Sequence, residues 1–266
     1  MKVRFAARSH PGRVRLSNED NFYCNGATLT PGNRDAPFAL NGSANVPCVF
    51  AVCDGMGGEE DGEFASLTAV TALAEHAKEI KSAAAAGTEK IHAAVRTFVT
   101  DANSRLCDAM RVRSLRMGTT LALVVITDDA VYPYNLGDSR IYALQSRRFT
   151  RVSEDHTLAA QKVEMGILTE AEARRDRGWH VLTRCLGIFQ DEMTVEPASA
   201  EPLPLGEGCR VLLCSDGLTD MVTDVRIAEI LRGAPVTEKA AERLVTEALE
   251  NGGRDNVTCV AVDVMT

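Results

Sequence analysis

Short apolar segments bounded by turn residues recur along the chain, and their length and β-branched content predict strands. They are Val46–Cys53, Thr119–Thr127, Ala130–Leu136, Arg140–Leu144, Arg210–Cys214 and Val257–Val264. In the last segment Val260, Val262 and Val264 share one face, which predicts a half-buried strand. Asp128-Asp129 separates two of the segments as a hairpin turn does, so we expect antiparallel neighbours.

Apolar residues spaced three or four positions apart predict helices in other regions. One continuous stripe consists of Ile91, Val95, Phe98, Val99, Ala102, Leu106 and Met110. Residues 63–81 are a second long candidate, and a third helix is predicted to follow Thr237 and to end at Gly252-Gly253. The inward-facing residues of this third helix are expected to be Leu244, Val245, Ala248 and Leu249. Shorter helices are predicted near 157–165 and 169–175.

Hairpins combined with paired helices favour an α+β layered domain over a series of βαβ units. The 266 residues are 45% hydrophobic and 25% charged, which is typical of a globular protein. No linker rich in Pro, Gly or Ser divides the chain, and no internal repeat is visible. We therefore expect residues 1–266 to form a single domain.

Charge and cysteine usage narrow the function classes and the compartment. Asp and Glu total 37 against 29 Lys and Arg, and the net charge of −8 disfavours nucleic-acid binding, which needs clustered positive charge. The eight cysteines include no C-x-x-C pair, and several lie in apolar runs, as reduced cysteines do. No signal-peptide core is visible, and the longest apolar stretch, Leu121–Ile126, is too short to span a bilayer. We expect a cytoplasmic monomer with no nucleic-acid or membrane partner.

Acidic residues at the ends of apolar runs, beside glycine or another acid, are the candidate metal ligands. They are Glu19, Asp20, Asp54, Asp138, Asp216 and Asp255. Acids at strand ends can converge at one edge of a layered sheet, where they repel one another unless they are protonated or bind cations. Oxygen ligands select Mg²⁺ or Mn²⁺, and the five histidines form no zincin pattern. Two such ions about 4 Å apart would polarise a shared water and hold the oxygens of a phosphate ester.

Each acidic motif also has a structural explanation when it is considered alone. Asp-Gly is a common turn, which would account for Asp54 or Asp216. Glu19-Asp20 alone could be a solvated pair, and Asp255 alone could begin a strand. It is the ordered coincidence of these motifs that favours a shared site.

In order along the chain, the motifs resemble the metal-dependent PPM family, the type 2C serine/threonine protein phosphatases, in its bacterial form. The matching segments are Gly12-x-Val14-Arg15-x-x-Asn18-Glu19-Asp20, Asp54-Gly-Met-Gly-Gly58 with Gly62-Glu63-x-Ala65-Ser66, Gly118-Thr119-Thr120, Gly137-Asp138-Ser139-Arg140, Asp155-His156, Leu182-Thr183-Arg184 with Leu186-Gly187, Ser215-Asp216-Gly217-Leu218 and Asp255-Asn256-Val257-Thr258. The resemblance covers residues 12–258. It implies a central antiparallel β-sandwich flanked by pairs of antiparallel helices, a four-layer α-β-β-α fold, with the metal centre at one end and a flap at about residues 157–181.

The resemblance also implies a ligand set for two Mn²⁺ or Mg²⁺ ions. Asp54 looks like the carboxylate that bridges both ions, and Gly55 resembles the carbonyl ligand of the first. The ligands of the second ion would be Glu19, Asp216 and Asp255. Asp138, together with Asp216, matches a weaker third-metal site.

Two further residues and the mechanism follow from the same resemblance. Asp20 matches a position that orients a metal-bound water, and Arg15 is similar to the arginine that grips the substrate phosphate. A planar guanidinium suits that role because it offers two parallel donors. The implied mechanism is direct attack of a metal-bridging hydroxide on phosphorus, without a covalent phosphoenzyme.

The proton donor to the leaving oxygen is not identified by the motifs. Met56 and Glu59 occupy positions where relatives carry histidine. A metal-bound water is our hypothesis, and a carboxylic acid at Glu59 is the alternative. His156 opens the flap, and we interpret it as structural.

The implied substrates are proteins that carry phosphoserine or phosphothreonine, which a serine/threonine kinase system supplies. Arg174, Arg175 and Arg177 could contact acidic phosphoproteins or form a solvated face, and Trp179 could dock a partner or pack against the sandwich. The alternatives are a catalytically silent member that acts as a regulatory binding module and a phosphatase of a partner-switching pathway. A metal-dependent nuclease is disfavoured by the acidic charge balance.

Overall fold

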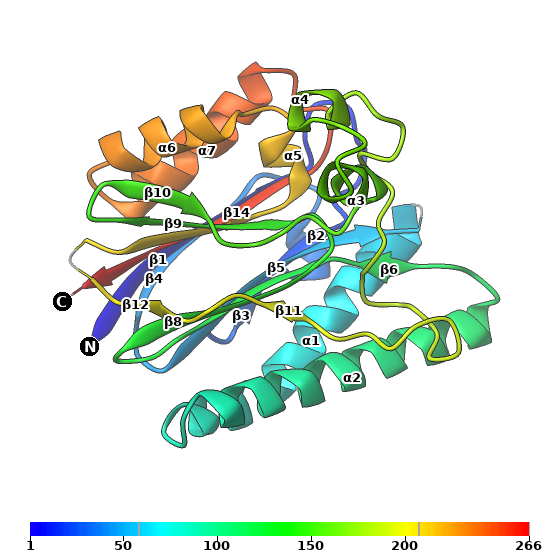
Figure 1. Cartoon of the computed structure of the whole chain (residues 1–266), viewed down its shortest axis with the longest axis horizontal. Helices are drawn as coiled ribbons and strands as arrows, with labels where there is room; N and C mark the ends of the chain where they lie inside the picture. Colours follow the sequence, from blue (N-terminus) through cyan, green and yellow to red (C-terminus); the bar gives the residue numbers. More distant parts are fainter. Residues whose placement is uncertain (58, 207, 266) are drawn as a thin grey trace.

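Two antiparallel sheets pack face to face and form the centre of the molecule (Figure 1). The structure is a computed structural model that describes residues 1–57, 59–206 and 208–265, without the side chains of Glu59 and Glu60. The first sheet has the order β10 (Arg148–Arg151), β9 (Arg140–Gln145), β13 (Arg210–Cys214), β14 (Val257–Met265), β1 (Lys2–His10) and β4 (Phe38–Asn45). The chain termini lie side by side, because β1 pairs with β14 along its whole length.

The second sheet has at its centre three adjacent strands that are almost entirely buried. Its main path is β11 (Ala198–Ser199), β8 (Ala130–Leu136), β7 (Leu121–Ile126), β5 (Cys48–Met56), β2 (Asp20–Cys24) and β3 (Ala27–Thr28). The short strands β12 (Leu203–Pro204) and β6 (Gly118–Thr119) pair with β8 and β5. The hairpin predicted at Asp128-Asp129 is confirmed, because β7 and β8 are antiparallel neighbours.

Helices cover both outer faces of the sandwich, as Figure 1 shows. The second sheet is covered by α1 (Glu59–Ala84) and α2 (Thr88–Arg113). The first sheet is covered by α5 (Asp216–Thr219), α6 (Asp224–Gly233) and α7 (Thr237–Glu250). The remaining helices are a 3-10 turn (Pro31–Asn33), α3 (Leu158–Glu164) and α4 (Glu170–Ala173). The predicted α+β fold with a central antiparallel sandwich between helix pairs is confirmed.

Alternation of side chains along each central strand divides the core into layers. In β5, Val49 and Ala51 pack under α1 and α2, whereas Phe50 and Val52 face the opposite sheet. The apolar stripe predicted for residues 91–110 is buried in α2.

The prediction of a half-buried strand at the end of the chain is wrong. Val260, Val262 and Val264 face the other sheet, but Cys259 and Ala261 are also buried, under α6 and α7. The strand lies between β13 and β1 and has helices on its outer face, so both of its faces are covered. A second, smaller correction concerns α7, which begins at Thr237 itself and not after it.

Candidate metal centre

A cleft of about 890 Å³ lies at one end of the sandwich, where strands from both sheets end. Its lining includes the predicted residues Arg15, Glu19, Asp54, Gly55, Asp138, Asp216 and Asp255. Asp20 lies directly beside them on β2. The residues that the motifs single out, from both ends of the sequence, therefore meet at one place.

Asp20 and Asp54 are brought together by strand register. They are paired positions on β2 and β5 of the second sheet. The Asp20 side chain is fully buried, and its Oδ2 accepts a hydrogen bond of 2.7 Å from the Ser215 hydroxyl. Its Oδ1 has no hydrogen-bond partner among the described residues. A buried carboxylate oxygen without a partner is costly, which indicates that a water or an ion belongs beside it.

Hydrogen bonds to Thr119 and Thr120 fix both the N–H and the carbonyl of Asp54. Its N–H donates to Thr120 Oγ1 at 2.9 Å, and its carbonyl accepts from the Thr120 N–H at 2.9 Å. The Thr119 hydroxyl donates to the same carbonyl, also at 2.9 Å. These tethers hold the Asp54 side chain in the cleft without using its carboxylate oxygens.

Gly55 and Gly62 allow the chain to approach Glu19 closely. A Cβ on Gly55 would lie 1.9 Å from the Gly62 carbonyl oxygen, and one on Gly62 would lie 2.3 Å from Glu19 Oε2. The Gly55 N–H also donates to the Glu19 carbonyl at 3.2 Å. Neither position can accept a side chain without moving α1 or Glu19 away from the cleft.

Asn256 joins the C-terminal ligand candidates to the N-terminal ones. Its Oδ1 accepts from the Glu19 N–H at 2.8 Å, and its Nδ2 donates to the Pro11 and Ser17 carbonyls at 2.9 and 2.8 Å. A Cβ on Gly217 would lie 1.9 Å from the Asn256 carbonyl oxygen, so the start of α5 is pressed against this segment. Asp216 and Asp255 are thereby held on the same side of the cleft.

Burial and mutual repulsion perturb the acids of the cleft. Burial, followed by the charges of Asp216 and Asp255, raises the pKa of Asp20 to about 7, although the hydroxyls of Ser215 and Thr258 act in the opposite direction. Burial and the charges of neighbouring acids also raise the pKa values of Asp54 and Asp138 well above the ordinary range. Divalent cations relieve both effects, and an all-oxygen donor set with an unsatisfied buried oxygen fits hard ions such as Mg²⁺ or Mn²⁺.

Arg15 lies at the rim of this acidic cleft. Its Nη2 donates to Asp255 Oδ2 at 2.8 Å while more than half of its side chain is exposed. This hydrogen bond to Asp255 and the charge of Asp255 raise the pKa of the guanidinium further. Arg15 is therefore an exposed cation in direct contact with one of the ligand candidates.

The end of the segment predicted to be a flap, residues 157–181, contributes residues that the sequence motifs do not identify. His180 Nδ1 lies 3.3 Å from Asp216 Oδ2, and its Nε2 lies 3.4 Å from Asp220 Oδ2. The Trp179 indole N–H donates to Asp220 Oδ1 at 3.1 Å, so Trp179 packs against the body of the protein. The Leu158 N–H donates to the Val181 carbonyl at 2.9 Å and so joins the two ends of this segment. The sequence offers one signal for His180, which is that it follows the single tryptophan, Trp179. No spacing rule relates His180 to Asp216.

The other candidates differ in how far the structure informs them. His156 Nδ1 accepts from the Gly137 N–H at 3.1 Å, and burial, aided by Arg184, lowers its pKa to about 4, which agrees with a structural role. Glu59, the alternative proton donor, lies outside the described side chains. Arg174 is exposed and lines the cleft, whereas Arg175 and Arg177 are exposed without lining it.

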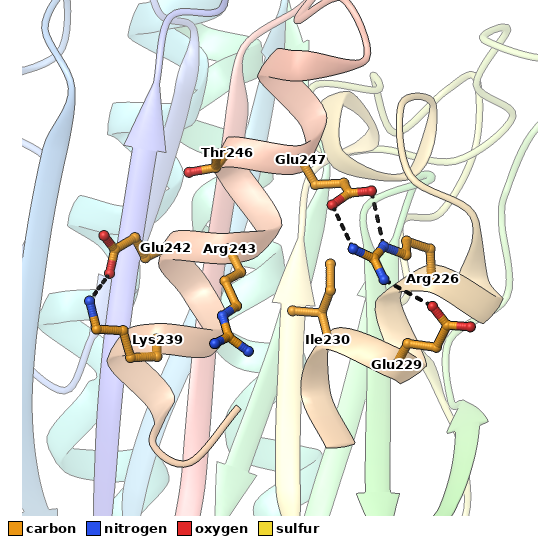
Figure 2. A pocket seen from close by; sticks show the side chains of 8 residues that line it. All are labelled: Arg226, Glu229, Ile230, Lys239, Glu242, Arg243, Thr246 and Glu247. Atoms are coloured by element: carbon orange, nitrogen blue, oxygen red, sulfur yellow. Dashed lines mark hydrogen bonds and ion pairs between the residues drawn. The ribbon is translucent and has the colours of Figure 1, made fainter. Parts of the chain in front are cut away.

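A second hollow lies on the outer face of α6 and α7 (Figure 2). Most of its charged side chains are paired with one another: Arg226 bonds Glu247 and Glu229, and Lys239 bonds Glu242. This hollow has the character of a solvated charged surface. Acids with strongly raised pKa values line the cleft instead.

Known proteins are similar to this chain along almost its entire length. A family model described as Protein phosphatase 2C matches residues 32–252. The serine/threonine phosphatase stp of Listeria monocytogenes serovar 1/2a is 33% identical over 258 residues, covering 96% of this chain and 94% of that protein. The S. agalactiae serine/threonine phosphatase structure has a TM-score of 0.84 at 26% identity, covering 99% of this chain and 100% of its own.

A metal-bound structure is also among the similar ones. The catalytic domain of the serine threonine protein phosphatase PstP, in complex with 2 manganese ions, has a TM-score of 0.79 at 32% identity and covers 100% of both chains. In the part of our chain that the structure describes, no helix is long and apolar enough to cross a membrane.

Proposed function

The chain belongs to the protein phosphatase 2C family, and from that premise we propose how its residues hydrolyse phosphoserine and phosphothreonine in proteins. It is a metal-dependent serine/threonine protein phosphatase that uses two Mn²⁺ or Mg²⁺ ions. A catalytically silent regulatory role is disfavoured by its similarity to named phosphatases. The observation that carries the residue-level proposal is the convergence of the perturbed acids in one cleft.

The ligands that would hold the ions are the residues gathered at that end of the sandwich. Asp54 would contact both ions, with the Gly55 carbonyl on the first and Glu19, Asp216 and Asp255 on the second. When bound, the ions lower the pKa of water and neutralise charge on the phosphate. The tethers on Asp54 and Asn256 keep these side chains in position before any ion arrives.

Asp20 is proposed to orient the attacking water. Its Oδ2 is fixed by Ser215, which leaves Oδ1 to accept a hydrogen bond from a water in the cleft. Arg15 is proposed to release Asp255 and to donate two parallel hydrogen bonds to the substrate phosphate. Asp138, together with Asp216, would provide a third and weaker metal position.

Cysteine chemistry plays no part in this proposal. Cys53 and Cys214 are the cysteines nearest in sequence to the ligands, and both are fully buried. Burial raises the pKa of each thiol, so neither is available as a nucleophilic thiolate.

We further propose that residues 1–266 act as one catalytic domain with a flap at 157–181. The phosphoproteins it acts on would be supplied by a cognate serine/threonine kinase, in the cytoplasm, and the enzyme would work as a monomer. The shared apolar layer between the sheets supports a single folding unit.

The test is Mn²⁺-dependent release of phosphate from a phosphothreonine peptide. We expect Asp54→Asn and Asp216→Asn to lower kcat/KM at least about a thousandfold, because metal ions contribute several kcal/mol and each 1.36 kcal/mol is tenfold. Asp108→Asn, an exposed carboxylate on α2, is the matched control and should match the wild type. Full activity in both cleft variants would overturn the ligand assignment, and an inactive wild type in saturating Mn²⁺ would favour a binding module.

A further inference from the structure

Three potential metal-binding side chains from separate parts of the chain meet at the edge of the cleft. Asp138 lies in the turn between β8 and β9, His180 lies at the end of the flap, and Asp216 is the first residue of α5. Each offers one donor atom, and these atoms all lie within 4.8 Å of one another. The set differs from the rest of the cleft because it includes a nitrogen.

The two ring nitrogens of His180 face different groups. Nδ1 faces Asp216 at 3.3 Å, and Nε2 faces Asp220 at 3.4 Å. Histidines that bind metals usually donate the second ring N–H to a carboxylate, which fixes the tautomer and the direction of the ring. Asp220 is suited to that role, because its other oxygen already accepts from the Trp179 indole at 3.1 Å.

We propose that His180 is a nitrogen ligand, through Nδ1, to a divalent cation that it shares with Asp138 and Asp216. The inference deepens the proposed function, because Asp216 is also a ligand candidate of the two-ion core. Imidazole strengthens binding of Mn²⁺ and of later transition ions relative to Mg²⁺. The third position is therefore selective for transition metals, and an ion bound there ties the flap to the body of the enzyme.

The competing explanation is a simple ion pair in which an imidazolium rests between Asp216 and Asp220. The two explanations predict opposite effects of removing the ring. If His180 is a ligand, its loss weakens cation binding at this position. If it is only a positive charge beside Asp216, its loss removes a competitor and cation binding becomes tighter.

Isothermal titration with Mn²⁺ and with Mg²⁺ separates these outcomes. We expect His180→Ala to weaken the weakest Mn²⁺ class about tenfold or more while the core class and Mg²⁺ binding stay unchanged. The matched control is His76→Ala, because His76 also lies near two carboxylates, Asp101 and Glu79, but on α1 away from the cleft. Unchanged or tighter Mn²⁺ binding in His180→Ala would overturn the proposal.

Trp179 provides a second readout that does not depend on catalysis. It is the single tryptophan of the chain and is the residue next to His180. Paramagnetic Mn²⁺ at this position should change its fluorescence in step with the weak class in the wild type, and in His180→Ala that phase should move to Mn²⁺ concentrations about tenfold higher or more. A phase that stays at the wild-type Mn²⁺ concentration in the variant contradicts the proposal.

A folding control and a functional control complete the design. If the unfolding curve of His180→Ala matches that of the wild type, any change in Mn²⁺ binding is local. Asp54→Asn tests the two-ion core independently. If the His180 prediction fails while Asp54→Asn still abolishes Mn²⁺-dependent hydrolysis, this inference is wrong and the proposed function stands.

Discussion

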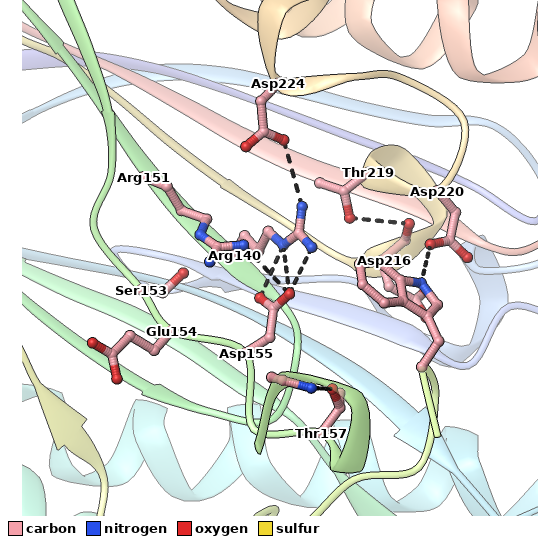
Figure 3. A network of polar contacts seen from close by, with 12 residues as sticks. Arg140, Arg151, Ser153, Glu154, Asp155, Thr157, Asp216, Thr219, Asp220 and Asp224 are labelled. Carbon is pink, nitrogen blue, oxygen red and sulfur yellow. Dashed lines mark hydrogen bonds and ion pairs between the residues drawn. The ribbon is translucent and has the colours of Figure 1, made fainter. Parts of the chain in front are cut away.

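Two groups of buried charges lie close together at the same end of the sandwich, and they differ in whether their charges are paired with residues of the chain. In one, Arg140 is 3% exposed and bonds Asp155 through Nε at 2.9 Å and Nη2 at 2.6 Å (Figure 3). Arg151 and Asp224 extend this network. In the other, Asp20, Asp54 and Asp138 gather with raised pKa values. Only one residue separates Asp138 from Arg140 in the sequence.

The contrast shows how one fold separates structural charges from functional ones. Burying a charge is costly unless it is paired and hydrogen-bonded. The Arg140 network meets that requirement with residues of the chain itself. In the cleft, we propose that cations from solution meet this requirement, because Arg15 and His180 contact the acids only from the rim. Trp179 lies between the two groups, because it lines hollows on both sides.

The largest effect on stability is expected from breaking the self-sufficient network. Arg140→Met leaves Asp155 buried without its main partner, and we expect the free energy of unfolding to fall by about 3–5 kcal/mol. Urea unfolding in metal-free buffer measures this loss. Asp54→Asn is the comparison variant, and it should not lower stability in the same buffer, because it removes a repelled carboxylate.

A small loss for Arg140→Met, or a loss of several kcal/mol for Asp54→Asn without metal, would show that the two groups are not different in kind.

The second prediction concerns pH in the absence of metal. The folded state keeps the Asp20 proton up to about pH 7, whereas the unfolded chain releases it near 3.8. Between these values unfolding releases a proton, so this group destabilises the fold as pH rises. The stability of the wild type minus that of Asp20→Asn should fall by up to about 4 kcal/mol from pH 4 to pH 7. Urea titrations at both pH values test this, and a difference that rises with pH would refute it.

The third prediction concerns cation binding. Mn²⁺ at about 100 times its dissociation constant should raise the free energy of unfolding by about 2.7 kcal/mol, because the ion binds the folded state alone. Arg140→Met should keep this increment, since the proposed metal ligands are intact in that variant. Asp54→Asn should lose most of it. Thermal unfolding with Mn²⁺ and with a chelator measures the increment. An equal increment in Asp54→Asn would argue against the proposed ligand set.

Sequence patterns predicted most elements of the fold because their signals are local. The α2 stripe and the β7–β8 hairpin are periodic and well punctuated, and both were found. β1 and β4 contain no continuous apolar run and were not predicted: β1 alternates apolar residues with Lys and Arg, and β4 is a largely polar edge strand. The second buried face of β14 depends on α6 and α7 packing over it, which no pattern within the strand records.

The acidic residues of the candidate site could be predicted because they lie next to turn residues at the ends of strands. Glu19-Asp20 and Asp54-Gly55 mark strand ends, and the structure brings them together. His180 could not be predicted, because its approach to Asp216 depends on how the flap folds back between Thr157 and Leu182. Asn256 was seen as part of a motif, but its links to Glu19 and Pro11 appear only in three dimensions.

The smallest effect is expected at a third class of charges, the exposed pairs over α6 and α7. Arg226 bonds Glu247 and Glu229 on the surface (Figure 2), where solvent and salt screen the attraction and holding the side chains costs conformational entropy. Arg226→Ala should therefore leave the urea midpoint and the Mn²⁺ increment at their wild-type values. Glu247→Gln is the matched variant on the other side of the pair. If either one lowered stability as much as Arg140→Met, burial would not be the property that separates the two buried groups from ordinary surface charge.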